Sequence, residues 1–339
     1  MNEQKLNPFE AEMGQNKVGY IIANFGGPRS LDEISPFLVE LLTDQDVLRT
    51  PLPKFVHRWI FSWIAKRRAL KVRSEYESMG GKSPIYEDTE CVASAMREHT
   101  ASPILTFHRY LPATHDGFLE KILKTPVDEW RILPLFPQFT YATTGSIARW
   151  FLDHLPQHIV NLFRWIKSYP CHPSFVESHV SLIKEYLQQH QLEYSDTILL
   201  FSAHGIPKKF IDTGDVYEQE CRQSFEAIMK GFPGLKGRLS FQSKFGPGEW
   251  LRPYTIDVCE RILEWNEGRK NVVFIPISFT SDHIETLCEI ENDYMTVVQE
   301  QGLNAYRVPA LNQHPCWIKA LREIIQENNL SGNKMLLSR

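Results

Sequence analysis

The chain has 339 residues, of which 42% are hydrophobic and 23% are charged, and its formal net charge is −4. This composition is typical of a soluble globular protein with one large domain or two smaller ones. The negative balance argues against a nucleic-acid binder, which would usually be basic, so we expect no nucleic-acid partner.

The cysteines and the N-terminal segment indicate the compartment. Six cysteines are scattered along the chain, and no two of them form a C-x-x-C pair. Isolated thiols indicate a reducing compartment and give no local zinc site. Residues 1–17 lack the basic start and apolar core of a signal peptide, and no apolar stretch is long enough to span a bilayer. We therefore predict a cytoplasmic protein.

Strand-like runs alternate with helix-like segments along the whole chain. This alternation predicts an α/β fold with one or two mostly parallel sheets, joined by right-handed crossovers. Apolar runs predict strands at 18–24, 104–110, 131–137, 197–203, 238–243, 271–277 and 305–309, with a weaker eighth near 159–168. Helical spacing of apolar residues predicts helices that include 174–189, 217–229, 253–267 and 315–327.

Two pairs of strand-and-loop segments resemble each other. Residues 20–28 resemble residues 199–207, and residues 131–140 resemble residues 272–280. The interval from the first segment to the second is 112 positions in the first half and 73 in the second, and we assign the surplus of 39 to an insertion at 37–72. Two similar α/β domains explain this pattern. Chance similarity between buried strands is the alternative.

The insertion at 37–72 is apolar and aromatic at first and then strongly basic. It contains Trp59 and Trp63, followed by a Lys-Arg-Arg run at 66–68. Beside a binding site, such a segment would hold a flat hydrophobic ligand or make a peripheral membrane contact. The alternative is a core helix with a solvated basic end, because aromatic stripes at helical spacing are usually core.

Polar loops follow the strands predicted at 197–203 and 271–277. His204 comes directly after the first strand, and Glu285 lies in the loop after the second. Because open α/β sheets bind ligands at the carboxyl ends of their strands, we expect these two side chains to face each other. An imidazole and a carboxylate suit a divalent metal or the transfer of a proton. For His204 alone, a structural histidine is the alternative.

Carboxylates occur at regular steps on both sides of Glu285. Asp282, Glu285, Glu289 and Asp293 recur every three or four residues, so on a helix they would line one face. We interpret them as a path that conducts hydrated cations inward, with a solvated acidic face as the alternative. His283 is predicted to orient Glu285.

Six motifs resemble those of the ferrochelatase family, whose members insert ferrous iron into a porphyrin at the end of haem synthesis. They occur in the family's order, and the resemblance runs from residue 18 to about residue 327. The motifs are Asn24-Phe-Gly-Gly-Pro28, Gly80-Gly-Lys-Ser-Pro84, Pro137-Gln-Phe-Thr-Tyr-Ala-Thr-Thr-Gly145, Ser202-Ala-His-Gly-Ile-Pro207, Gln242-Ser-Lys-Phe-Gly-Pro247 and Phe279-Thr-Ser-Asp-His-Ile-Glu-Thr-Leu287.

The resemblance implies a chelatase-like α/β fold of two similar Rossmann-like domains, each a parallel sheet flanked by helices. We place them at 17–168, with the insertion, and at 169–330. It implies a chelatase of the lyase class, with Fe²⁺ and protoporphyrin IX as substrates and release of two pyrrole protons. His204 and Glu285 would be the inner catalytic and metal-binding pair.

The resemblance also implies the residues that surround the porphyrin. Among them, Arg109 would pair with a propionate, since guanidinium and carboxylate fit bidentately. An ordinary ion pair is the alternative for Arg109, and the basic run at 66–68 is a weaker candidate for the same role. The implied porphyrin-binding residues are Phe25, Tyr76, Arg109, Tyr110, Thr143, Thr144 and Ser146.

Two departures from parts of the family refine these expectations. Some members carry an iron–sulfur cluster on a cysteine-rich C-terminal extension, whereas this chain has no cysteine there and has Tyr141 in the loop that would supply another ligand. We therefore expect no such cluster. Relatives that act on coproporphyrin tend to have tyrosine where this chain has Phe25, which favours protoporphyrin IX. Two alternatives to this function are a different tetrapyrrole metallation enzyme and a porphyrin carrier.

Overall fold

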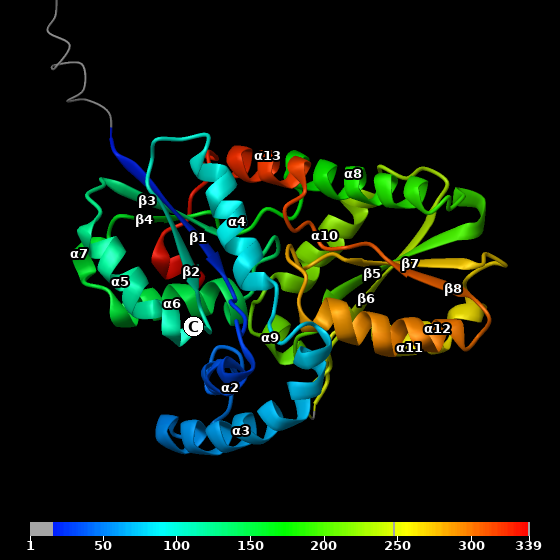
Figure 1. The fold of residues 1–339 in the computed structure, drawn as a ribbon, viewed down its shortest axis with the longest axis horizontal. Coiled ribbons are helices and arrows are strands. Elements are labelled where there is room, and N and C mark those ends of the chain that lie inside the picture. Colours follow the sequence, from blue (N-terminus) through cyan, green and yellow to red (C-terminus); the bar gives the residue numbers. More distant parts are fainter. Residues whose placement is uncertain (1–15, 247, 338–339) are drawn as a thin grey trace, which may run out of the picture.

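The computed structural model describes residues 16–246 and 248–337. Within these residues the chain forms two parallel four-stranded sheets (Figure 1). The first sheet has the order β2-β1-β3-β4, and the second has the order β6-β5-β7-β8. The strands are β1 (Val18–Asn24), β2 (Ile104–His108), β3 (Glu129–Pro134), β4 (Phe163–Trp165), β5 (Thr197–His204), β6 (Lys236–Gln242), β7 (Asn271–Pro276) and β8 (Asn304–Arg307).

Helices connect the strands and cover the sheets. Most lie where the apolar spacing predicts them, but the helix predicted at 253–267 is shorter, because it ends at Glu260 and continues as a 3-10 turn. The helices are α2 (Ile34–Leu42), α3 (Lys54–Ser78), α4 (Ile85–Arg97), α5 (His115–Lys124), α6 (Ser146–His154), α7 (Gln157–Val160), α8 (Pro173–Gln189), α9 (Lys208–Asp212), α10 (Tyr217–Met229), α11 (Thr255–Glu260), α12 (Met295–Gln299) and α13 (Pro315–Ile324), with π-helices at Tyr141–Gly145 and Glu285–Tyr294.

The two sheets repeat one topology. β1 pairs in parallel with β2 and β3, and β5 pairs in the same way with β6 and β7. The segments that resemble each other in sequence therefore occupy equivalent central places. The predicted α/β fold with two parallel sheets is confirmed.

Each sheet is buried on both faces, as its unbroken apolar strands require. On the first sheet, Ile21 and Ile132 pack with α5 and α6, while Ile22 and Leu133 pack on the opposite face with α4 and α13. Figure 1 shows α13, in red, lying beside α8 and close to α4, although both helices are distant from it in sequence. The domain boundary after residue 168 stays a prediction, since helices from 169–330 share the first sheet's core.

Residues 37–72, predicted to be an insertion, cover most of α2 and α3, which pack against each other (Figure 1). Part of α3 is buried, but Phe55 and Trp59 are each 76% exposed and Trp63 is 54% exposed. The aromatic stripe is therefore a surface feature and not a core helix face. None of the helices in the described part of the chain is long and apolar enough to cross a membrane.

Some expectations concern residues outside the described ranges. The absence of a signal peptide was inferred mainly from residues 1–15, and the absence of a C-terminal cysteine extends to the last two residues, 338 and 339. Pro247, the last residue of the fifth motif, is also outside the described ranges.

Candidate active site

His204 and Glu285 meet at the carboxyl edge of the second sheet. His204 is the last residue of β5, and its Nδ1 lies 2.9 Å from Glu285 Oε2. Both side chains are about one-third exposed, at 35% and 30%. The backbone N–H of His204 donates to Ser278 Oγ, in the loop that follows β7, at 2.9 Å. The predicted meeting of these two side chains is thus present in the structure.

Gly205 allows β5 to turn closely past the end of β6. A Cβ at this position would lie 2.7 Å from the carbonyl oxygen of Gln242, which is closer than van der Waals contact allows. The backbone N–H of Gly205 instead donates to that same carbonyl at 2.8 Å. A glycine is therefore needed where the chain leaves His204 for its loop.

The pair carries opposite pKa shifts. Burial alone lowers the pKa of His204, but the carboxylates of Glu285 and Glu289 outweigh it and raise the pKa above its ordinary value. Burial raises the pKa of Glu285, but His204 and His283 outweigh it and hold that pKa well below its usual range. Without a metal ion, these shifts favour an imidazolium–carboxylate pair. A cation that binds the imidazole must displace its proton.

His283 lies near the same oxygen of Glu285 that His204 contacts. Its Nε2 is 3.6 Å from Glu285 Oε2, and its ring packs against Phe279 with a centroid distance of 4.4 Å. His283 Nδ1 is buried and has no hydrogen-bond partner among the described residues. This position fits a group that orients Glu285, which stays a prediction.

The acidic residues do not form one helical face. Glu285 begins a π-helix that ends at Tyr294, whereas Asp282 lies in the loop before it. Asp282 accepts hydrogen bonds from Arg307 Nη1 at 2.8 Å and from Asn312 Nδ2 at 2.7 Å. Expecting Asp282 on the same helix face was wrong, because the helix starts later and is wider than an α-helix.

Glu289 and Asp293 continue from Glu285 along the π-helix. Glu289 accepts from the backbone N–H of Ser243 at 2.9 Å and from the Tyr294 hydroxyl at 2.5 Å. Glu75, near the end of α3, faces this helix: partial burial first and the Asp293 carboxylate second raise its pKa. The sequence analysis missed Glu75, since its only sequence signal is that it is one of two carboxylates, with Glu77, at the end of a basic helix.

The ends of β1 and β2 hold the predicted aromatic residues. The backbone N–H of Tyr110 donates to the Phe25 carbonyl at 2.9 Å, and the two rings meet edge to face with centroids 4.5 Å apart. Tyr76 is buried in the same apolar cluster. Burial, and then the nearby Glu285 charge, raise the pKa of Tyr76. This cluster therefore reaches the His204–Glu285 pair.

The predicted polar residues converge on a carboxylate that the sequence analysis missed. Asp44 Oδ2 accepts from Arg109 Nη2 at 2.8 Å, from the Tyr110 hydroxyl at 2.9 Å and from Ser146 Oγ at 2.5 Å. One sequence signal was available, because Asp44 follows an apolar run and has no basic residue within four positions. The hydroxyls of Thr143 and Thr144 are buried without hydrogen-bond partners among the described residues.

Comparison with known proteins identifies the family. Residues 17–329 match the family model described as ferrochelatase. The chain belongs to the ferrochelatase family. Proteins named ferrochelatase from Chlamydia caviae and Chlamydia abortus are each 45% identical to it. The first alignment covers 94% of this chain and 98% of the relative, and the second covers 91% and 95%.

Solved structures agree with the fold. The chelatase SirB from Bacillus subtilis, determined with Fe³⁺, superposes with a TM-score of 0.50 at 13% identity, covering 91% of this chain and 96% of that one. A sirohydrochlorin chelatase SirB from Bacillus subtilis subspecies spizizenii, in complex with cobalt, has a TM-score of 0.50 at 11% identity, covering 92% and 94%. At such low identity the likeness supports the chelatase fold only.

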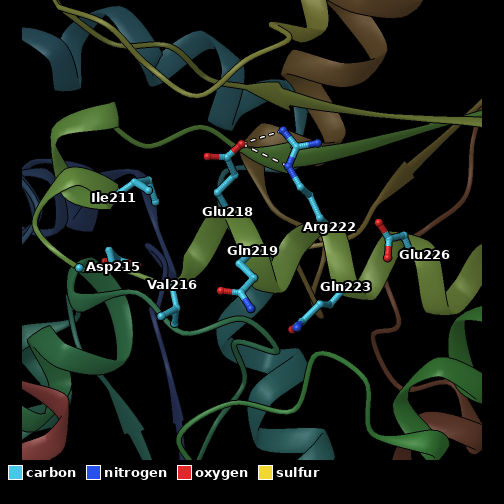
Figure 2. Close-up of a pocket in the computed structure, with 9 residues that line it drawn as sticks. Ile211, Asp215, Val216, Glu218, Gln219, Arg222, Gln223 and Glu226 are labelled. Carbon is cyan, nitrogen blue, oxygen red and sulfur yellow. Dashed lines mark hydrogen bonds and ion pairs between the residues drawn. The ribbon is translucent and has the colours of Figure 1, made fainter.

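A separate groove runs along the surface of α10 (Figure 2). It is open to solvent, and within it Arg222 is paired with Glu218 at 2.7 Å. None of the predicted site residues lines this groove, so we assign it no part in the site of this ferrochelatase-family chain. Its lining is Ile211, Gly214, Asp215, Val216, Glu218, Gln219, Arg222, Gln223 and Glu226.

Proposed function

We propose that this chain inserts ferrous iron into protoporphyrin IX to give protohaem. One observation carries the assignment to named residues: the His204 imidazole lies 2.9 Å from the Glu285 carboxylate at the sheet edge where this fold binds ligands. Membership of the ferrochelatase family supports the reaction. The dicationic iron replaces two pyrrole protons, so charge is balanced when both protons leave the ring.

The two side chains suit both halves of the exchange. A neutral imidazole and a carboxylate are suitable ligands for Fe²⁺ as it sheds water. The imidazole can accept and release a proton near neutral pH, whereas the low pKa of Glu285 keeps its carboxylate ionised beside it. We assign metal binding and proton acceptance to His204 and Glu285 together, with His283 holding the Glu285 carboxylate in place.

The porphyrin is proposed to bind against the first sheet's edge and the insertion. Phe25 supplies aromatic contact, with the buried rings of Tyr76 and Tyr110 packed behind it, and the polar part of this surface is formed by Arg109 with the 143–146 loop. Binding energy from such a surface can bend the ring so that its nitrogens point toward the incoming metal. A flat, undistorted ring would hold its N–H groups in plane and away from the iron.

Iron is proposed to reach the pair along the π-helix. Glu289 is one turn beyond Glu285, Asp293 follows, and Glu75 lies near Asp293 on the facing helix. Carboxylate oxygens at such spacing can pass a hydrated cation inward. Asp282 is held by Arg307 and Asn312, so its contribution is to position the start of this helix through Thr286, whose hydroxyl donates to it at 2.8 Å.

The exposed stripe on α3 is proposed to make a peripheral membrane contact. Phe55, Trp59 and Trp63 are exposed one helical turn apart, with Arg58 and Lys66 among them. Aromatic residues beside basic ones suit the interface of an anionic bilayer. Co-sedimentation with anionic vesicles should fall when Trp59 and Trp63 become Ser and stay unchanged for Leu263→Ser, an exposed apolar residue elsewhere. Equal sedimentation of all three proteins would contradict this contact.

No iron–sulfur cluster is proposed, because the C-terminal segment supplies no cysteine. Anaerobically purified protein should therefore lack acid-labile sulfide. Sulfide in stoichiometric amount would overturn this part of the proposal without touching the chelatase reaction.

Anaerobic incubation with protoporphyrin IX and Fe²⁺ tests the function directly, with haem formation followed by absorption and porphyrin fluorescence. We expect turnover in the wild-type chain and its loss in His204→Ala and Glu285→Gln. Tight porphyrin binding without turnover would instead indicate a carrier. Turnover only with cobalt, or only with coproporphyrin, would indicate a different tetrapyrrole metallation enzyme.

A further inference from the structure

Asp44 places a carboxylate of the chain itself where the polar porphyrin-binding residues converge. It lies in the loop between α2 and α3, and its side chain is only 5% exposed. Arg109, Tyr110 and Ser146 all donate to the same oxygen, Oδ2. The Tyr110 and Ser146 hydroxyls are also 3.1 Å from each other, so the group forms one connected network.

Asp44 neutralises the Arg109 guanidinium. Arg109 gives Asp44 one N–H and gives Ser146 Oγ another at 2.8 Å, while Nη1 is buried and has no hydrogen-bond partner among the described residues. A ligand carboxylate that approached Nη1 would meet the Asp44 carboxylate across the same guanidinium. Two carboxylates that share one cation repel each other strongly where water is largely excluded. The surface formed by Arg109, Ser146 and Asp44 therefore suits an uncharged edge of the porphyrin ring.

The loop that carries Asp44 is held on both sides. Arg149 Nε lies 2.5 Å from the carboxylate of Asp46. Further along, the Arg49 guanidinium lies 3.9 Å from the centre of the Phe210 ring, and its Nη1 donates to Thr213 Oγ1 at 3.0 Å. These contacts tie the loop to α6 and to α9, so Asp44 cannot swing away from Arg109 without breaking them.

Resting on the proposed function, we propose that Asp44 is a specificity-determining residue that keeps porphyrin carboxylates away from Arg109. Protoporphyrin IX carries its two propionates on one edge, so its uncharged edge can face Asp44. Coproporphyrin carries a propionate on every pyrrole, so each orientation brings a carboxylate toward this surface. The chain accordingly prefers the two-propionate ring, with the propionates facing away from Asp44.

Equilibrium binding of metal-free protoporphyrin IX and coproporphyrin to the full chain, followed by porphyrin fluorescence, tests this preference apart from turnover. Asp44→Asn frees the Arg109 cation and should lower the ratio of the coproporphyrin Kd to the protoporphyrin Kd by about tenfold, which is the effect of removing one close like charge. Adding Arg109→Gln to Asp44→Asn should abolish this gain. Glu40→Gln, on α2, removes a nearby carboxylate that makes no hydrogen bond to Arg109, Tyr110 or Ser146, and it should leave the ratio unchanged.

An unchanged ratio in Asp44→Asn, or a gain that survives Arg109→Gln, overturns the inference. If circular dichroism shows that Asp44→Asn does not fold, Arg109→Gln alone decides, because it leaves the carboxylate without its cation and should raise the ratio; an unchanged ratio then overturns the inference. A wild-type chain that forms no haem would refute the proposed function. A chain that forms haem while Asp44→Asn keeps the wild-type ratio would refute only the role of Asp44.

Discussion

The two sheets share one strand order but carry different chemistry where their strands end. At the first sheet, β1 leads to Phe25, and β2 leads to Arg109 and Tyr110. At the second sheet, β5 ends in His204, and the chain after β7 reaches Glu285. One edge thus offers aromatic and neutralised groups, and the other offers an imidazole and a carboxylate, to which we assign the exchange of protons and metal. The difference shows that the repeated scaffold fixes where a site lies and that the loops decide what it does.

This contrast predicts separable kinetic effects. Changes at the second sheet's edge should alter the use of iron, and changes at the first sheet's edge should alter the use of porphyrin. A substitution that raised the KM for iron and the KM for porphyrin equally would weaken the contrast.

The largest effect is expected for Glu285→Gln. It removes the charge that balances His204 and Fe²⁺, so kcat should fall by about a thousandfold, within the range for loss of a proton acceptor. The measurement is anaerobic haem formation under saturating substrates. Protoporphyrin binding, followed by fluorescence, should stay within a few-fold of wild type. A variant that loses porphyrin binding to the same extent as turnover would contradict the assignment.

Phe25→Ala should show the complementary pattern. Its ring packs edge to face on Tyr110 and lies in the apolar cluster that reaches the His204–Glu285 pair. Removing it should raise the KM for protoporphyrin by about thirtyfold, the equivalent of about 2 kcal/mol of lost aromatic contact. The KM for iron should not change. Phe25→Leu, which keeps apolar bulk, should recover part of the loss; no difference between the two variants would argue against ring contact.

The fold could be predicted from the sequence further than the site could. Buried parallel strands are continuous apolar runs, so β1, β5 and β7 were recognisable without structural data. β4 was weaker because it has only three residues and its middle residue, Arg164, is exposed. The packing of α13 on the first sheet could not be predicted, because no local pattern records which sheet a distant helix covers.

The site was predictable where a strand ends and unpredictable where distant loops meet. His204 and Glu285 follow recognisable strands, which is why their proximity could be expected. Asp44 becomes meaningful only when a loop 65 residues before Arg109 folds against it. The prediction of one acidic helix face failed for Asp282, because an α-helical period was assumed for a segment that begins at Glu285 and forms a π-helix.

His179 tests whether the two sheets unfold together. It is buried in α8, whose residues Val176 and Leu182 pack against cores of both sheets. Burial lowers the pKa of His179 to about 3, so below its ordinary value of 6.5 the unfolded chain takes up a proton that the folded chain does not. Stability is unaffected above pH 6.5 and falls as the pH drops toward 3, by about 2 kcal/mol at pH 5.

His179→Leu should remove this part of the acid sensitivity, measured as the free energy of unfolding in urea at pH 7 and pH 5. The control is His190→Leu, at the exposed end of the same helix, which should keep the wild-type difference. We expect a single cooperative unfolding transition in which both sheets unfold together. A loss at pH 5 that is equal in His179→Leu and wild type would show that another group causes it.

The smallest effect, and the finest test of the contrast, is expected for Glu289→Gln. Glu289 lies one π-helical turn from Glu285 and acts on His204 through its charge alone, less strongly than Glu285 does, so its main effect should be on the arrival of iron. The KM for iron should rise about tenfold, equivalent to about 1.4 kcal/mol, while kcat and the KM for porphyrin change little. Glu291→Gln is the matched control, because Glu291 is two residues along the same helix and is paired with Arg307 at 2.7 Å. If both variants raise the KM for iron equally, the general negative charge of this helix attracts the cation, and no ordered path is needed. If only Glu289→Gln does so, the position of the carboxylate is what counts, and the second sheet's edge handles the metal from its entry to its insertion.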